Sequence, residues 1–380
     1  MPEQNTRLKL VDITKTYPGV IANYRVNMSI MKGEIHALLG ENGAGKSTLV
    51  KCIYGVQKAD SGNLFWEDQK MQITNPAHAR NLGIGMVFQN FSLFDAMTVA
   101  ENIALGISAN LVDGNLDKRI RKISTLYGLP LDPNRYVYTL SVGERQRIEV
   151  VRCLLQNPLL LIMDEPTSVL TPQEVEKLFE TLKRLANEGV SILYISHKLE
   201  EIRALCHTAT IMRMGKVVTK CIPSSETTRS LAEMMMGEHL VSPKRNNKIK
   251  GKNLKLKTLN LTSKTETDQG TNLENINIHI HSGEILGIAG IAGNGQRELM
   301  EVLSGEKLSE KPETIKINGK LAGHLDPVER RMAGVGIIPE ERLGHGAVPY
   351  MSLWENAFLS AAKRMQLSKQ GFIRIGSAMA

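Results

Sequence analysis

The sequence predicts an α/β fold in a chain made of two related halves. Short apolar runs, typical of buried parallel strands, are followed by turn residues and then by helix-like stretches. A glycine-rich segment lies between one such strand and one such helix. The same glycine spacing returns further along the chain, which indicates a duplication. Together these observations predict two units, each built of strands, a glycine-rich loop of the phosphate-binding type, and helices.

Length and composition limit the number of domains and the class of protein. The chain has 380 residues, of which 42% are hydrophobic and 23% charged, so it exceeds one ordinary domain and has an average soluble composition. No run approaches the roughly 18 apolar residues of a membrane span. The first residues lack a secretory apolar segment, so we expect a chain made and kept in the cytosol. The four cysteines show no CxxC spacing and are expected to be reduced thiols.

The formal net charge of +8 permits a nucleic-acid or anionic-membrane partner without requiring one. A cluster of basic residues without an acid occupies one stretch, and we interpret it as a solvated linker in preference to a binding arm. Its members are Lys244, Arg245, Lys248, Lys250, Lys252, Lys255 and Lys257.

The duplication predicts the domain organisation. Gly33-Glu34-Ile35 recurs as Gly283-Glu284-Ile285, and the register continues through later glycines to Glu101-Asn102 and Glu355-Asn356. We expect a first domain at residues 5–238, a basic linker at 239–257 and a second domain at 258–380. The second copy ends about halfway through the pattern of the first, so only its N-terminal part is expected.

A phosphate-binding loop is predicted at residues 40–47, which fit the pattern G-x-x-x-x-G-K-[ST]. An apolar strand at 34–39 precedes the loop and a helix at 47–54 follows it, so its N–H groups and the helix start are expected to hold a phosphate. Lys46 would reach the β- and γ-phosphates, and Ser47 would ligate Mg²⁺. The alternative is a glycine turn in an unrelated strand-helix unit. The expected nucleotide-binding residues are Gly40, Glu41, Asn42, Gly43, Ala44, Gly45, Lys46, Ser47 and Thr48.

Candidate catalytic residues follow two later strands. The strand at 159–163 ends in Asp164 and Glu165, where Asp164 would hold Mg²⁺ and Glu165 would polarise the attacking water. These acids could instead cap the next helix, but Thr171 and its capping box already supply that cap. A second strand at 190–196 ends at His197, which is interpreted as a γ-phosphate sensor in preference to a structural histidine.

Residues 140–147, LSVGERQR, resemble the signature LSGGQ-xQR of the ATPase subunits of ABC transporters. The resemblance implies a P-loop NTPase fold with antiparallel β and helical subdomains. It also implies that Ser141, Gly143 and Glu144 face a nucleotide held by another domain. Val142 and Glu144 depart from the family pattern, and Thr171 stands where the family has an aspartate.

The same resemblance assigns Tyr17 to stacking on adenine, with a strand-edge tyrosine as the alternative. It assigns Gln89 to the loop that links Mg²⁺ and the attacking water to the membrane partner. Apolar residues follow Gln89, and they fit either local core or a groove for a transporter helix. They are Phe91, Leu93, Phe94 and Met97.

A duplicated chain with a short linker is similar to the sugar-importer branch, and residues 140–174 are most similar to the ATPases of nucleoside importers. The resemblance implies ATP and Mg²⁺ as cofactors, transmembrane permease subunits as partners and, indirectly, an extracytoplasmic solute-binding protein. It implies no nucleic acid, a place at the cytoplasmic face of the cell membrane and a dimeric sandwich of ATPase domains.

The second copy is altered at its phosphate loop, where Gln296 replaces Lys46 and Arg297 replaces Ser47. Glu340 stands opposite Gln89, and no second signature follows. Hydrolysis is therefore not expected there, and we expect weak turnover unless two first copies dimerise. Two other functions remain open: a soluble ABC ATPase that acts on ribosomes or nucleic acid, and a truncated non-catalytic module.

Overall fold

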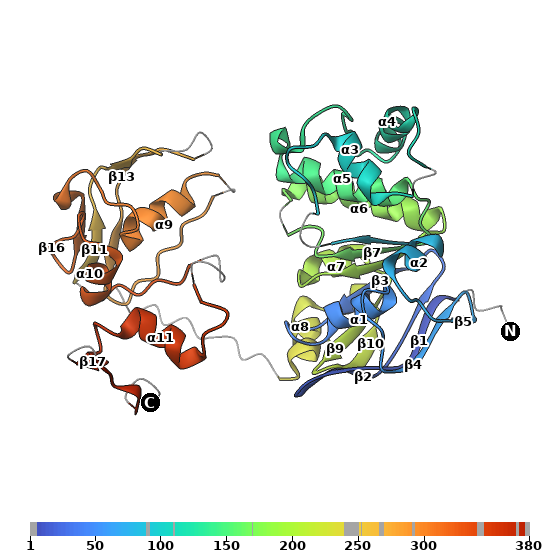
Figure 1. Cartoon of the computed structure of the whole chain (residues 1–380), viewed down its shortest axis with the longest axis horizontal. Coiled ribbons are helices and arrows are strands. Elements are labelled where there is room, and N and C mark those ends of the chain that lie inside the picture. The colour runs from blue at the N-terminus through green and yellow to red at the C-terminus, as the bar shows by residue number, and fades with distance from the viewer. Residues whose placement is uncertain are drawn as a thin grey trace. The chain divides into compact units, whose positions relative to one another are not determined.

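The computed structural model describes residues 6–88, 92–108, 111–168, 170–238, 251, 253–265, 270–290, 293–339, 346–369 and 372–376. The chain divides into two compact units, Met1–Ser242 and Pro243–Ala380, each with its own sheets (Figure 1). Gln89, Phe91 and Glu340 lie outside the described residues.

A six-stranded sheet forms the centre of the first unit, in the order β10-β9-β3-β8-β7-β6. All neighbours are parallel except β10, which pairs antiparallel with β9. The central strands read as continuous apolar runs because helices or a second sheet cover both faces. The strands are β3 (Ile35–Leu39), β6 (Ile84–Val87), β7 (Leu160–Asp164), β8 (Ser191–Ile195), β9 (Thr208–Arg213) and β10 (Lys216–Cys221).

An antiparallel sheet covers one face. Its order is β2-β1-β4-β5, with β1 (Thr6–Tyr17), β2 (Val20–Met31), β4 (Ser61–Trp66) and β5 (Gln69–Met71). Helix α1 (Lys46–Ile53) buries Leu49, Val50 and Ile53 in a core shared with residues of both sheets. The loop that begins α1 is thereby fixed on two sides.

Helices cover the other face of the six-stranded sheet and share the larger core. They include α3 (Val99–Gly106), α4 (Leu116–Leu126), α5 (Val142–Leu154), α6 (Pro172–Asn187), α7 (Leu199–Leu205) and α8 (Thr228–Met236), while α2 (Pro76–Asn81) precedes β6. The expected capping box at α6 is present, because Thr171 accepts from the N–H of Glu174 and proline occupies the first turn. The antiparallel and helical parts of the expected fold are both confirmed.

The second unit contains smaller sheets. A four-stranded sheet has the order β14-β11-β15-β16, and β12-β13 and β17-β18 form pairs. Its strands are β11 (Leu254–Thr258), β12 (Leu261–Ser263), β13 (Leu273–Ile276), β14 (His279–His281), β15 (Ile315–Ile317), β16 (Lys320–Leu321), β17 (Ser368–Lys369) and β18 (Phe372–Ile373). Its helices are α9 (Gln296–Ser304), α10 (Pro327–Met332) and α11 (Leu353–Ala361). Strand β11 starts at Leu254, inside the segment expected to be linker, because it pairs with β14 and β15.

The duplication is visible in local geometry. Asn102 accepts from the N–H of Phe94 at 2.7 Å and donates to its carbonyl at 3.0 Å. Asn356 makes the same pair of bonds with Val348, at 2.7 and 3.1 Å. Each asparagine thus closes an equivalent loop before an equivalent helix.

Burial differs between the copies. Ile35 in β3 is 0% exposed, whereas its counterpart Ile285 is 98% exposed. In the first unit β3 lies between β8 and β9, which come from residues 191–213. Within the described part of the second unit, no strand pairs with residues 284–290.

Candidate nucleotide-binding site

The predicted phosphate loop joins β3 to α1, and its backbone requires glycine. Gly43 and Gly45 have φ values of 85° and 96°, in the left-handed region. A Cβ atom on Gly45 would lie 2.2 Å from the carbonyl oxygen of Ala22, and one on Gly40 would lie 2.4 Å from that of Met212. These oxygens belong to packed strands, so the loop can keep this shape only if the residues at positions 40 and 45 have no side chain.

Lys46 lies over its own loop. Its Nζ donates to the carbonyl oxygens of Gly40 at 2.6 Å and Glu41 at 2.9 Å. Burial lowers the pKa of Lys46, while the nearby carboxylates of Glu165, Asp164 and Glu41 oppose that shift. The ammonium group is therefore held between the mouth of the loop and acidic side chains, where a polyphosphate would meet it.

The acidic residues and the histidine come together at the carboxyl edge of the sheet. Glu165 follows β7, His197 follows β8, and their Oε1 and Nδ1 atoms are 3.1 Å apart. Strands β3, β8 and β7 are neighbours, so the phosphate loop, His197 and Asp164-Glu165 leave the same edge. Burial raises the pKa of Asp164, and the charge of Glu165 raises it further, whereas Lys46 lowers it.

Glu165 has an unusual backbone. Its φ is 48°, a left-handed value that is rare for a residue with a side chain, and its N–H donates to the carbonyl of Ile195 at 2.8 Å. This bond ties the end of β7 to the end of β8. It fixes the backbone position from which the Glu165 carboxylate reaches His197.

Comparison with known proteins identifies the family of this chain. The sequence family described as ABC transporter matches residues 24–168. The nucleoside import ATP-binding protein NupA of Lactococcus lactis is 38% identical over 374 residues, which cover 97% of this chain and 73% of NupA. The chain belongs to the ABC transporter ATP-binding proteins.

Other relatives agree. The glucose import ATP-binding protein TsgD13 of Haloferax volcanii is 35% identical over 383 residues, which cover 92% of this chain and 69% of TsgD13. The dimeric structure of a post-hydrolysis state of the ATP-binding cassette MJ0796, bound to ADP and Pi, is 26% identical with a TM-score of 0.51. That match covers 57% of this chain and 98% of the cassette. The chain is accordingly an ATP-binding, ABC-type ATPase.

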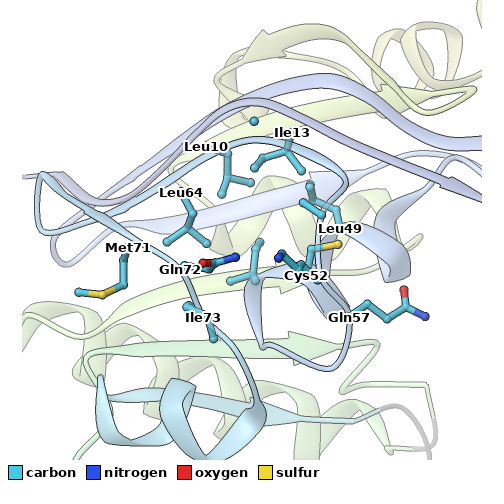
Figure 2. Close-up of a pocket in the computed structure, with 13 residues that line it drawn as sticks. Leu10, Ile13, Leu49, Cys52, Gln57, Leu64, Met71, Gln72 and Ile73 are labelled. Atoms are coloured by element: carbon cyan, nitrogen blue, oxygen red, sulfur yellow. The ribbon is translucent and has the colours of Figure 1, made fainter.

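Tyr17 ends β1 of this ABC ATPase with a partly exposed ring. Its hydroxyl donates to Oε1 of Gln57, and Nζ of Lys15 lies 5.8 Å from the ring centroid. Gln57 also lines a cavity of about 90 Å³ between the antiparallel sheet and the flank of α1 (Figure 2). Leu10, Ile13 and Leu64 form much of its wall, so the cavity is distinct from the phosphate loop.

The signature segment begins α5. Ser141 is the N-cap of α5 and accepts from the N–H of Glu144, whose Oε2 accepts from the N–H of Ser141 at 2.9 Å. The Oε1 atom of Glu144 pairs with Arg135 at 2.7 Å. Burial opposes ionisation of Glu144, but the bonds to Ser141 and the charge of Arg135 leave its pKa lowered. Both carboxylate oxygens of this expected nucleotide contact are thus used within the chain.

Gly143 lies close to the side chain of Glu174, because a Cβ atom there would lie 2.0 Å from Oε1 of Glu174, the end of a flexible side chain that would have to shift. Within the described part of the first unit, no hydrogen bond joins Ser141, Gly143 or Glu144 to the phosphate loop. The structure therefore brings Lys46, Asp164, Glu165 and His197 together and leaves the signature apart from them.

The described end of the altered loop in the second unit, residues 293–297, keeps the left-handed glycines of the first. Gly293 and Gly295 have φ values of 87° and 93°, close to those of Gly43 and Gly45. Arg297 pairs with Glu301 along α9, with Nε and Oε1 3.1 Å apart. The guanidinium is thus engaged on the helix surface, while a neutral amide, Gln296, stands in place of the lysine.

Sequence reasoning missed two buried polar groups. Asn23 on β2 contacts the phosphate loop, and Glu34 and His36 form a buried pair at the start of β3 with Nδ1 and Oε1 3.0 Å apart. The signal for the pair is two polar residues at alternate positions of an otherwise apolar strand. The signal for Asn23 is the difference between the two copies, because Leu273, an apolar residue, stands at the corresponding position of the second.

Two searches of the described residues gave negative results. No helix among them is long and apolar enough to cross a bilayer. In the same part of the chain, no three His, Cys, Asp or Glu side chains are grouped so that they could hold a metal ion.

Proposed function

We propose that this ABC ATPase binds and hydrolyses ATP as the energy-coupling subunit of an importer for nucleosides or monosaccharides. The names of NupA and TsgD13, both import ATP-binding proteins, support the direction of transport and the two classes of solute. The observation that carries the chemistry is the meeting of Lys46, Asp164, Glu165 and His197 around one glycine loop. ATP binding alone would need only the loop, whereas hydrolysis needs the acids.

In this proposal the loop at residues 40–48 holds the triphosphate and Tyr17 stacks on adenine. The Lys46 ammonium must leave the carbonyls of Gly40 and Glu41 to meet the β- and γ-phosphates. The N–H groups at the start of α1 add the positive end of the helix dipole. The Tyr17 ring is partly exposed, its hydroxyl donates to Gln57, and Nζ of Lys15 lies 5.8 Å from the ring centroid, so adenine would stack on the ring face that Lys15 leaves open.

Asp164 and Ser47 supply a carboxylate and a hydroxyl, which suit Mg²⁺, and Gln89 is the third expected ligand. The raised pKa of Asp164 fits such a site. Burial and the neighbouring charge of Glu165 make the ionised form of Asp164 unfavourable, and a bound cation would offset both effects. When bound, Mg²⁺ would neutralise charge that develops on the phosphates.

For hydrolysis we assign Glu165 as general base and His197 as the side chain that contacts the γ-phosphate. Water attacks the γ-phosphorus, its proton passes to Glu165, and ADP leaves as the bond to the β-phosphate oxygen breaks. The contact of 3.1 Å between Glu165 and His197 holds the two side chains in register for this step.

The signature would act on a second nucleotide-binding domain. Because the Glu144 carboxylate is used in the capping box and by Arg135, we assign its nucleotide contact to Ser141 and to the N–H groups at the start of α5. A dimeric sandwich in which α5 of one domain faces the phosphate loop of another would complete each site.

The transmembrane permease would dock on the loop after Gln89, at the cytoplasmic face of the membrane. The ATPase would be linked to the extracytoplasmic solute-binding protein only indirectly, through the permease. Leu93 packs against the main core, whereas Phe94 is 61% exposed, so the apolar loop is partly core and partly surface. An exposed aromatic side chain on a loop anchored by Asn102 is suited to a helix of the permease.

The test is co-purification from membranes of cells that produce the full chain. Wild type should retain the permease, whereas Phe94→Asp should lose it. Ile222→Asp is the matched control, because Ile222 is 56% exposed and follows β10, outside this loop in the sequence. Equal recovery of permease by both variants, or recovery of ribosomes with no permease, would contradict the proposal.

A further inference from the structure

Asn23 lies on β2 beneath the phosphate loop and is 0% exposed. Its Nδ2 donates to the carbonyl oxygen of Gly45 at 3.0 Å, and the same oxygen accepts from the N–H of Leu49 at 3.0 Å. The amide must face Gly45 with its nitrogen, because a carbonyl can only accept. Its Oδ1 then points elsewhere, and it has no hydrogen-bond partner among the described residues.

An unpartnered buried oxygen destabilises a fold, so stability alone would favour an apolar residue here. The second unit has that arrangement, with Leu273 at the corresponding position. Nδ2 of Asn23 lies 2.7 Å from an ideal Cβ on Gly45, and Cδ2 of Leu273 lies 3.1 Å from one on Gly295. The φ values of these glycines, 96° and 93°, are nearly equal. The glycine before the helix therefore reaches the same φ value without the amide.

A trans peptide explains what the amide adds. The carbonyl of Gly45 and the N–H of Lys46 belong to one planar unit and point in opposite directions. In both copies the helix orients this carbonyl, since Gly45 accepts from the N–H of Leu49 at 3.0 Å and Gly295 accepts from that of Leu299 at 2.9 Å. Asn23 adds a second donor from β2, so the Gly45 carbonyl, and with it the N–H of Lys46 on the opposite side of the peptide, is held by two bonds instead of one. The second unit, where Gln296 replaces the lysine, has no such bond from Leu273.

We infer that Asn23 is a positioning residue for the triphosphate, which adds a second hydrogen bond to the Gly45 carbonyl and so restrains the Gly45–Lys46 peptide for phosphate binding at the expense of stability. The inference rests on the proposed nucleotide site at residues 40–48. It predicts that triphosphate affinity and fold stability change in opposite directions when Asn23 is replaced by the residue of the other copy.

The experiment compares Asn23→Leu with wild type in the full chain. Binding of ATP and of adenosine is measured by calorimetry, and thermal unfolding of the first unit is followed by the fluorescence of Trp66 in a Trp354→Phe background. Loss of one positioning hydrogen bond should weaken ATP binding about three- to tenfold. Adenosine, which has no phosphate, should bind as before, and the Tm should rise by roughly 2–4 °C.

Leu273→Asn is the reciprocal control, and it should lower the stability of the second unit without changing ATP affinity. If Asn23→Leu does not fold, Asn23→Ala serves instead, and its affinity loss should again appear with ATP and not with adenosine. A folded variant with wild-type ATP affinity, or with equal losses for ATP and adenosine, would overturn the inference. Wild type that binds no ATP would instead refute the proposed site itself.

Discussion

Substitution of Gly45 by alanine tests the phosphate loop against a control within the same chain. Gly45 and Gly295 have nearly equal φ values, 96° and 93°, but different surroundings. A Cβ atom on Gly45 would lie 2.2 Å from the backbone oxygen of Ala22. One on Gly295 would lie 3.1 Å from the side-chain Cδ2 of Leu273, which can move.

The magnitude follows from that contrast. A left-handed conformation costs an alanine about 1–2 kcal/mol, and both variants bear this cost. Only Gly45→Ala must also displace the loop from β2, because a backbone oxygen in a paired strand cannot retreat. We therefore expect Gly295→Ala to lower the stability of the second unit by about 1–2 kcal/mol and to leave ATP affinity unchanged. Gly45→Ala should destabilise the first unit by more and weaken ATP binding at least about 100-fold, near 2.8 kcal/mol.

The assay uses the two tryptophans, since Trp66 lies in the first unit and Trp354 in the second. In Trp354→Phe and Trp66→Phe backgrounds, urea unfolding followed by fluorescence reports each unit separately. ATP affinity is measured by calorimetry on the same proteins. Gly45→Ala that destabilises no more than Gly295→Ala, and that keeps ATP affinity, would refute the reasoning.

Three further outcomes are expected. Lys46→Ala should abolish tight ATP binding in equilibrium dialysis, because it removes the cation at the loop mouth, and Lys51→Ala should not; equal affinities would disprove that role. Glu165→Gln should retain ATP but lower turnover by about 10² to 10⁴ in a phosphate-release assay, and wild-type turnover would remove Glu165 as the base. Burial opposes ionisation of Glu34, but hydrogen bonds from His36, Thr208 and the Met31 N–H lower its pKa below the ordinary 4.5. Its contribution to stability is therefore complete above about pH 4.5 and is lost as the pH falls through the lowered pKa. In urea titrations Glu34→Gln should flatten that acid dependence, and an unchanged slope would exclude Glu34 as its source.

Much of the first unit could be predicted because local patterns determine local structure. The loop at residues 40–47, the capping box of α6 and the strands that end at Asp164 and near His197 each depend on neighbours a few residues away. The use of Glu144 could not be predicted in the same way. Its second partner, Arg135, lies outside the signature, and only the folded helical part brings them together.

The sequence alone determined where the backbone could take left-handed φ values without a steric cost: at Gly43 and Gly45, and at Gly293 and Gly295 in the repeat, because glycine has no Cβ atom. Tertiary structure alone decided proximity and burial. Lys46, Glu165 and His197 meet because β3, β8 and β7 are adjacent, an order that chain sequence does not state. Ile35 is buried and Ile285 exposed despite matching local sequence, because solvent is excluded by neighbouring strands and not by the strand itself.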